Sequence, residues 1–193
     1  MTTDQTNKRD GIIGGALTVA LLLTLAVQNA VPPMATDMYS AAFPQITVDL
    51  ATNSTMLGFT LTTFFVGYAS GQVLGGAISD QIGRRRPIIA GGIIALVGSI
   101  ICVFTPGIWV LLVGRVFQGL GGGASSVARA ILVDVARGKT LARAMSLIQA
   151  IVGFAPMLAP VLGAFIITHA TWRVVFWALA AFTLLMAALA WFV

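Results

Sequence analysis

Two ionisable side chains, Asp37 and Arg115, stand inside long apolar stretches of this sequence. A charged group within the hydrocarbon of a membrane is costly, so its presence there indicates a function such as proton or substrate movement. We expect both side chains in the outer half of a bilayer, where a carboxylate and a guanidinium stabilise each other. Desolvation raises the proton affinity of a carboxyl group and a nearby arginine lowers it, so relative movement would change proton binding. The two residues are a candidate proton-coupling pair; alternatively, Asp37 lies at the wet interface and caps a helix end.

A second group of charges lies at a predicted turn, where Asp80 precedes three consecutive arginines that begin at Arg84. Gly76 and Gly83 flank Asp80 and indicate a tight turn, and the four-residue spacing to Arg84 allows an ion pair. The charges form a candidate latch on the cytoplasmic face, although membrane topology alone also explains basic residues there. Arg129 alternatively extends its side chain toward the interface. The candidate gating residues are Gly76, Asp80, Gly83, Arg84, Arg85, Arg129 and Asp134.

A proline pair, Pro156 and Pro160, stands four residues apart between Gly153 and Gly163. Each proline lacks a backbone N–H and leaves a helix carbonyl without its donor, so two of them soften one helix. Such a helix suits a moving part better than a rigid scaffold. Glycines spaced by four residues in two other stretches provide flat surfaces for close helix packing.

The elements that position these residues follow from the composition. Charged residues make up 9% of 193 and glutamate is absent, whereas apolar residues reach 58%. An ordinary soluble domain contains roughly 25% charged residues, so we predict an all-α integral membrane protein. The net charge of +5 does not indicate a nucleic-acid partner, because the basic residues stand in short groups between apolar stretches.

A helix needs roughly 20 apolar residues to cross a bilayer. The sequence predicts a cytoplasmic tail at residues 1–10 and six transmembrane helices within 11–193. Their expected ranges are about 11–39, 56–79, 87–104, 108–135, 141–168 and 171–193. The first stretch reads as a signal anchor, because it runs past the length of a signal-peptide core without a clear cleavage site.

The distribution of basic residues sets the orientation. On the side of the N-terminus lie Lys8, Arg9, Arg84, Arg85, Arg86, Arg137, Lys139 and Arg143. The opposite side holds Arg173. Because loops rich in lysine and arginine stay in the cytoplasm, we expect a cytoplasmic N-terminus.

Catalysis has little support in the sequence. Cys102 is the single cysteine and His169 the single histidine, and neither has a nucleophile pair or a metal partner within its own stretch. No phosphate-binding loop of a nucleotide hydrolase is present in the sequence. We therefore expect no enzyme, no cofactor and no metal site, and any transport would be driven by an ion gradient.

Three motifs resemble those of the major facilitator superfamily. Residues 76–87, GAISDQIGRRRP, resemble its signature loop between the second and third helices. Residues 111–121, LLVGRVFQGLG, are similar to the fourth-helix motif of its proton-linked members. Residues 153–163, GFAPMLAPVLG, resemble its fifth-helix antiporter motif in the form with two prolines, with Ala155 in place of the central glycine.

Within the superfamily, Thr36-Asp37-Met38-Tyr39 followed by Pro44-Gln45-Ile46 resembles the drug:proton antiporters of the Bcr/CflA type. Those relatives carry Leu-Pro after the tyrosine, where this chain has Ser40-Ala41. The resemblance implies the N-terminal six-helix half of a twelve-helix fold, which is built from 3+3 inverted repeats.

The resemblance also implies roles for single residues. Arg115 would take part in proton transfer, and Asp37 would be a proton or cationic-substrate site. The loop charges would stabilise the outward-facing state, and the two prolines would help to define antiport. The candidates for the substrate cavity are Tyr39, Phe64, Gln118 and Gln149.

We therefore expect proton-coupled efflux of drug-like or amphipathic molecules across a bacterial inner membrane. The expected partners are the lipid bilayer, a small-molecule substrate with protons, and either a missing C-terminal six-helix half or a second copy. A fragment or truncated chain is favoured over a working homodimer. The alternatives are a metabolite (sugar or amino-acid) exporter of the same fold and a non-transporting remnant or regulatory membrane partner.

Overall fold

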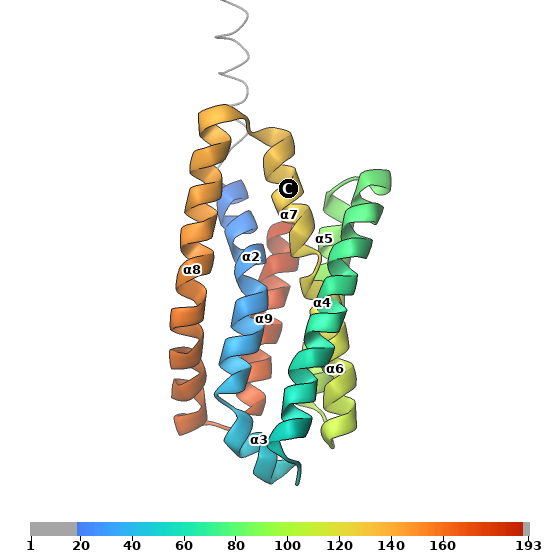
Figure 1. Ribbon diagram of the computed structural model, residues 1–193, viewed down its shortest axis with the longest axis vertical. Coiled ribbons are helices and arrows are strands. Elements are labelled where there is room, and N and C mark those ends of the chain that lie inside the picture. The colour runs from blue at the N-terminus through green and yellow to red at the C-terminus, as the bar shows by residue number, and fades with distance from the viewer. Residues whose placement is uncertain (1–18, 191–193) are drawn as a thin grey trace, which may run out of the picture.

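The computed structural model describes residues 19–190, which form a bundle of long helices (Figure 1). The predicted tail at 1–10, with Lys8 and Arg9, and the start of the first predicted span lie outside the described residues. The helices are α2 (Val19–Ser40), α3 (Phe43–Asp49), α4 (Ser54–Ile82), α5 (Arg85–Val103), α6 (Ile108–Gly122), α7 (Ser125–Val135), α8 (Gly138–His169) and α9 (Arg173–Leu189). No strand occurs within residues 19–190, so the predicted all-α fold class is confirmed.

Long helical segments lie at each of the predicted spans: α2, α4, α5, α6 with α7, α8 and α9. By length and composition, three segments of the described chain are apolar enough to cross a membrane: α5, Ile108–Asp134 and α8. α9 is a shorter apolar helix. The long helix α4 is not among these three, because threonine, serine and glutamine recur along it. Two of its polar side chains, Thr60 and Ser79, are buried in the interior of the bundle.

Two features differ from the expected ranges. The connection at 40–55 contains a short helix, α3, because Pro44 stands in its first turn, where the missing N–H costs no hydrogen bond. The expected helix 108–135 is one crossing segment but divides at Gly123 and Ala124 into α6 and α7. The third of three consecutive glycines, Gly121 to Gly123, stands at this division, and glycine favours a helix interior least of all residues but proline.

Glycines decide how closely α6 approaches its neighbours. α6 packs against both α4 and α5. A Cβ at Gly71 would collide with the carbonyl of Leu120, and one at Gly119 would collide with the carbonyl of Phe64. The backbones of α4 and α6 can touch only because these side chains are absent, as in many membrane helix pairs.

On the other side of the bundle, α2 packs against α8 and α9 (Figure 1). The turn from α4 to α5 and the connection from α7 to α8 lie at the upper end of the view, and α3 lies at the lower end. We call the upper end the basic end; its basic residues are Arg84, Arg85, Arg86, Arg137, Lys139 and Arg143. Gly83 closes α4 there with φ 87°, a conformation that glycine adopts without strain.

Candidate functional site

Arg115 lies at the centre of the site, on α6, and its side chain is fully buried. Its guanidinium carbon lies 4.4 Å from the ring centroid of Tyr39 on α2 and 4.4 Å from that of Phe64 on α4. A cation between two aromatic faces is stabilised by their quadrupoles, the more so when water is excluded. We call this arrangement the arginine cage.

Polar contacts fix the orientation of the caged guanidinium. One terminal nitrogen donates to the carbonyl of Ala35 at 3.0 Å and to the side-chain oxygen of Gln118. The amide nitrogen of Gln118 donates to Ser99 on α5 at 2.8 Å. The Nε and the other terminal nitrogen of Arg115 are buried without a hydrogen-bond partner. The site therefore holds a cation whose hydrogen-bonding capacity is only partly used.

The hydroxyl of Tyr39 completes the cage at a distance of 2.6 Å from that of Thr60 on α4. Thr60 in turn donates to the carbonyl of Leu57 at 2.6 Å. Three of the four cavity candidates, Tyr39, Phe64 and Gln118, thus surround Arg115. The fourth, Gln149, is exposed on α8.

Asp37 and Arg115 do not form the expected ion pair in this conformation. Among residues 24–190, no carboxylate lies within ion-pair distance of Arg115. Asp37 is half-buried and accepts a hydrogen bond from the hydroxyl of Thr36 at 3.1 Å. The reason is the helix itself: residues two apart on a helix face different sides, and Ala35 occupies the side that faces Arg115.

At the basic end, Arg84 joins α4 to α7. It forms ion pairs with Asp80 at 2.7 Å and with Asp134 at 3.0 Å, and it donates to Ser79 at 2.7 Å. The hydrogen bond to Asp134, together with both negative charges, raises the pKa of Arg84 above its ordinary value. We call these contacts the Arg84 network.

The remaining gating candidates lie around this network. Gly76 and Gly83 have open space where a Cβ would stand. Arg85 is exposed at the first residue of α5. Arg129 is exposed on α7 and forms no ion pair with a described residue. The network thus consists of one arginine, two carboxylates and a serine.

The motif on α8 contacts α2. A Cβ at Gly163 would lie 2.7 Å from the carbonyl oxygen of Met38 and 3.0 Å from the Cβ of Ala41. Gly153 has no such neighbour within 4 Å. Pro156 and Pro160 are exposed along the helix, which remains continuous through both. Close packing therefore explains Gly163 but not Gly153.

Several polar groups of the structure were not expected from the sequence. Asp49, at the end of α3, accepts a hydrogen bond from the indole of buried Trp172 at 2.8 Å. Arg173 lies 3.7 Å from the same carboxylate and stacks on Trp172. Gln28 on α2 is fully buried, and neither polar atom of its amide has a partner. An amide inside an apolar stretch was the signal that could have identified Gln28.

The sequence of this chain is similar to those of known transporters. The sequence model described as Major Facilitator Superfamily matches residues 25–193. The chain is 35% identical over 161 residues to the uncharacterized transporter YdgK of Bacillus subtilis, covering 82% of this chain and 40% of that protein. It is 34% identical over 149 residues to the multidrug resistance protein MdtL of Escherichia coli K12, covering 77% and 38%. The chain thus spans about 40% of the length of these relatives.

Solved structures share the fold. A proton:xylose symporter, XylE, superposes with a TM-score of 0.79 at 17% identity, covering 90% of this chain and 44% of that one. The POT family transporter PepTSo gives a TM-score of 0.75 at 15% identity, covering 89% of this chain and 37% of that one. The predicted half-transporter fold is therefore confirmed. With its apolar helices, the chain is a multi-pass membrane protein, and it belongs to the Major Facilitator Superfamily of transporters.

Proposed function

We propose that this chain is the N-terminal half of a proton-coupled exporter of drug-like, amphipathic or cationic molecules, of the Bcr/CflA type. The observation that carries the proposal is the arginine cage. Arg115 is fully buried and has no carboxylate partner among residues 24–190. The multidrug resistance name of the MdtL relative supports the substrate class.

A buried cation without a counter-ion provides an electrostatic attraction that can move α2. Desolvation of an isolated charge costs several kcal/mol, so the cation attracts any negative charge that can approach it. Asp37 lies two residues along α2 from Ala35, whose carbonyl already accepts a hydrogen bond from Arg115. When Asp37 is ionised, this attraction favours a rotation of α2 that brings the carboxylate toward Arg115. When Asp37 binds a proton, the attraction disappears and α2 returns.

Movement of α2 would be transmitted to α8. Met38 follows Asp37 in α2, and its carbonyl oxygen lies against Gly163 of α8, so the two helix backbones are in close contact there. The prolines at 156 and 160 each remove one helix hydrogen bond from α8, which lowers the cost of bending it. A proton that binds on one side and leaves on the other would thus exchange two arrangements of α2 and α8, which is alternating access.

The proposal includes an orientation. Loops rich in arginine and lysine stay in the cytoplasm, so the basic end would face the cytoplasm of a bacterium and the chain would lie in its inner membrane. The Arg84 network would then keep the cytoplasmic face closed in the outward-facing state. The second wall of the substrate path would come from a further six-helix half or from a second copy, as in transporters with a site between two repeats.

The proposal is tested in liposomes with an imposed proton gradient, by measuring uptake of a fluorescent lipophilic cation. Two forms are compared: the chain itself, and the chain fused to the C-terminal half of the MdtL relative. Gradient-dependent uptake by either form, abolished by Asp37→Asn and by Arg115→Met, supports the proposal. Arg143→Gln, which removes an exposed cation on α8, is the control and should leave uptake unchanged.

Two results would contradict the proposal. Uptake that persists in Asp37→Asn would show that this carboxylate does not carry the coupled proton. Absence of gradient-dependent uptake in both forms would refute drug:proton antiport, and direct uptake of radiolabelled xylose or amino acids into the same liposomes would then identify another substrate class.

A further inference from the structure

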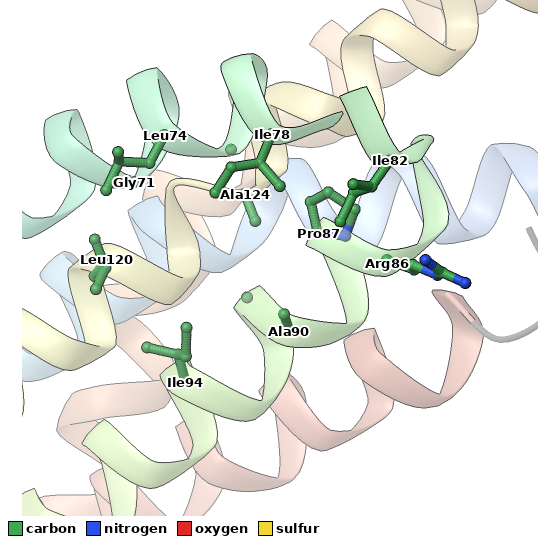
Figure 2. Close-up of a pocket in the computed structure, with 12 residues that line it drawn as sticks. Gly71, Leu74, Ile78, Ile82, Arg86, Pro87, Ala90, Ile94, Leu120 and Ala124 are labelled. Atoms are coloured by element: carbon green, nitrogen blue, oxygen red, sulfur yellow. The ribbon is translucent and has the colours of Figure 1, made fainter. Parts of the chain in front are cut away.

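An apolar groove runs along the bundle between α4 and α5, and its floor is formed by Leu120 of α6 and by Ala124, which joins α6 to α7 (Figure 2). Its volume is about 250 Å³. Leu74, Ile78 and Ile82 form the wall on α4, and all three are about half exposed. Ala90 and Ile94 form the facing wall on α5 (Figure 2).

Small residues in the lining explain why this surface is hollow. Gly71 and Gly91 cannot carry a side chain, because a Cβ would collide with Leu120 and with Ala124 respectively. Ala90 contributes only a methyl group to the wall. The larger side chains along α4 therefore stand beside a channel that nothing in the described chain fills.

The groove has the length of one membrane leaflet. It extends along α4 from Gly71 to Ile82, which at 1.5 Å per residue is about 16 Å. The hydrocarbon core of a bilayer is about 30 Å thick, so one leaflet contributes about 15 Å. A helix, which is about 10 Å across with its side chains, is too wide for a channel of this volume. An unbranched hydrocarbon chain is narrow enough.

One end of the groove carries a positively charged side chain. Figure 2 shows Arg86 beyond Ile82 and Pro87, at the end of the groove that lies at the basic end. Arg86 is exposed and makes no ion pair or hydrogen bond with a described residue, whereas Arg84 is held by two carboxylates. It is also the one charged residue of the lining. A phosphodiester at this position would meet an unused guanidinium, which binds phosphate oxygens in a bidentate manner.

We propose that this groove is a binding site for one anionic phospholipid, with an acyl chain between α4 and α5 and the headgroup phosphate on Arg86. The bound lipid would span α4, α5 and the junction of α6 with α7 near the Arg84 network. It would thereby stabilise the arrangement of helices in which that network is closed. This site is separate from the arginine cage and does not depend on the transported substrate.

The site is tested by native mass spectrometry of the purified chain with phosphatidylglycerol at increasing lipid-to-protein ratio. Each bound lipid adds its own mass, so occupancy is counted directly. We expect one tightly retained phosphatidylglycerol. Arg86→Gln should weaken its apparent affinity at least tenfold, and Arg86→Lys should retain most of it. Ala90→Phe should remove it by filling the groove.

Matched controls lie at the same end of the bundle. Ala188→Phe adds the same bulk to an exposed alanine of α9, and Arg143→Gln removes an exposed cation of α8; both should bind lipid as the unaltered chain does. Circular dichroism and size-exclusion chromatography of each variant check that it is folded, and Arg86→Gln tests the site without altering its shape.

Four outcomes would overturn the inference. The first is unchanged retention in both Arg86→Gln and Ala90→Phe. The second is equal loss in Ala188→Phe, which would indicate a general effect of surface bulk. The third is equal retention of phosphatidylethanolamine with the same acyl chains, unaffected by Arg86→Gln, which would mean that Arg86 does not select an anionic headgroup. The fourth is displacement by free glycerol phosphate, which would indicate a phosphate site without a role for the groove.

Discussion

Replacing Arg115 by methionine should leave the chain more thermally stable than replacing it by lysine, although lysine keeps the charge. In the cage, the guanidinium gains two hydrogen bonds of about 2 kcal/mol each and two aromatic contacts of about 2 kcal/mol each. Against these stand its desolvation, several kcal/mol for one ion, and two buried nitrogens without partners, at about 1–3 kcal/mol each. The opposing contributions nearly cancel, so the charge adds little net stability.

The two variants separate charge from packing. Methionine removes the charge and still fills much of the space between Tyr39 and Phe64. Lysine keeps the desolvation cost but lacks the planar fork that reaches Gln118 and Ala35 together. Alanine removes the charge and leaves a void, which costs about 2–5 kcal/mol more than a filled site. We therefore expect the order methionine above lysine, with alanine below methionine by about 6–15 °C in Tm.

The single cysteine provides the assay. Cys102 is fully buried on α5, where a Cβ at Gly114 of α6 would collide with its sulfur. A thiol-reactive fluorogenic dye will therefore label it only on unfolding, at one defined position beside Leu111, which lies one turn before Arg115 on α6. If the lysine variant melted above the methionine variant, the contacts of the cation would outweigh its desolvation. The arginine cage would then be a structural element, and the electrostatic drive proposed for Asp37 would be wrong.

Three further perturbations follow from the described contacts. Gly163→Val should push α8 away from α2 and lower Tm by several degrees, about 1–3 kcal/mol of overpacking. Gly153→Ala has open space and should leave Tm unchanged or raise it; equal losses in both would contradict the packing role. Asp134→Asn should weaken the Arg84 network, so a single cysteine introduced at the basic end should react faster with a maleimide, and an unchanged rate would count against a latch. Asp49→Ala should leave the indole N–H of Trp172 buried without an acceptor and lower Tm, at a cost of about 1–3 kcal/mol; Asp49→Asn, which keeps an acceptor, should preserve most of the stability, and similar loss in both would disagree with the hydrogen bond as the cause.

The long helices could be predicted because each is a long apolar stretch with few charges, and this property can be recognised without any knowledge of packing. The short helix α3 could not, because its seven residues carry no helical pattern strong enough to be separated from a loop. Its position is determined from outside, by the hydrogen bond of Asp49 with Trp172, which is 123 positions further along the chain. The turn at Gly83 was predictable, because glycine with an acidic residue before it and basic residues after it marks a boundary in the sequence alone.

Only part of the site could be predicted from the sequence. Arg115 could be singled out because a charge in an apolar stretch is rare. The partners of Arg115 could not be predicted, because they depend on which side of α2 faces α6. A difference of two residues turns a side chain to another side of the helix, so the sequence pointed to Asp37 where the structure places the carbonyl of Ala35. Backbone acceptors have no side-chain signature, and no reading of residue types would have identified this one.

One turn of α2 connects the motifs that the sequence distributes over three other helices. The carbonyl of Ala35 binds Arg115 of α6, the hydroxyl of Tyr39 pairs with Thr60 of α4, and the carbonyl of Met38 faces Gly163 of α8. Asp37 lies within this same turn, so a change in its charge acts on a segment that three helices contact. The close packing at Gly163 leaves no free space between α2 and α8, and the arginine cage leaves none between α2 and α6. A rotation of α2 must therefore either break the contact with Ala35 or carry α6 with it, which makes this turn the place where proton binding and helix movement would be linked.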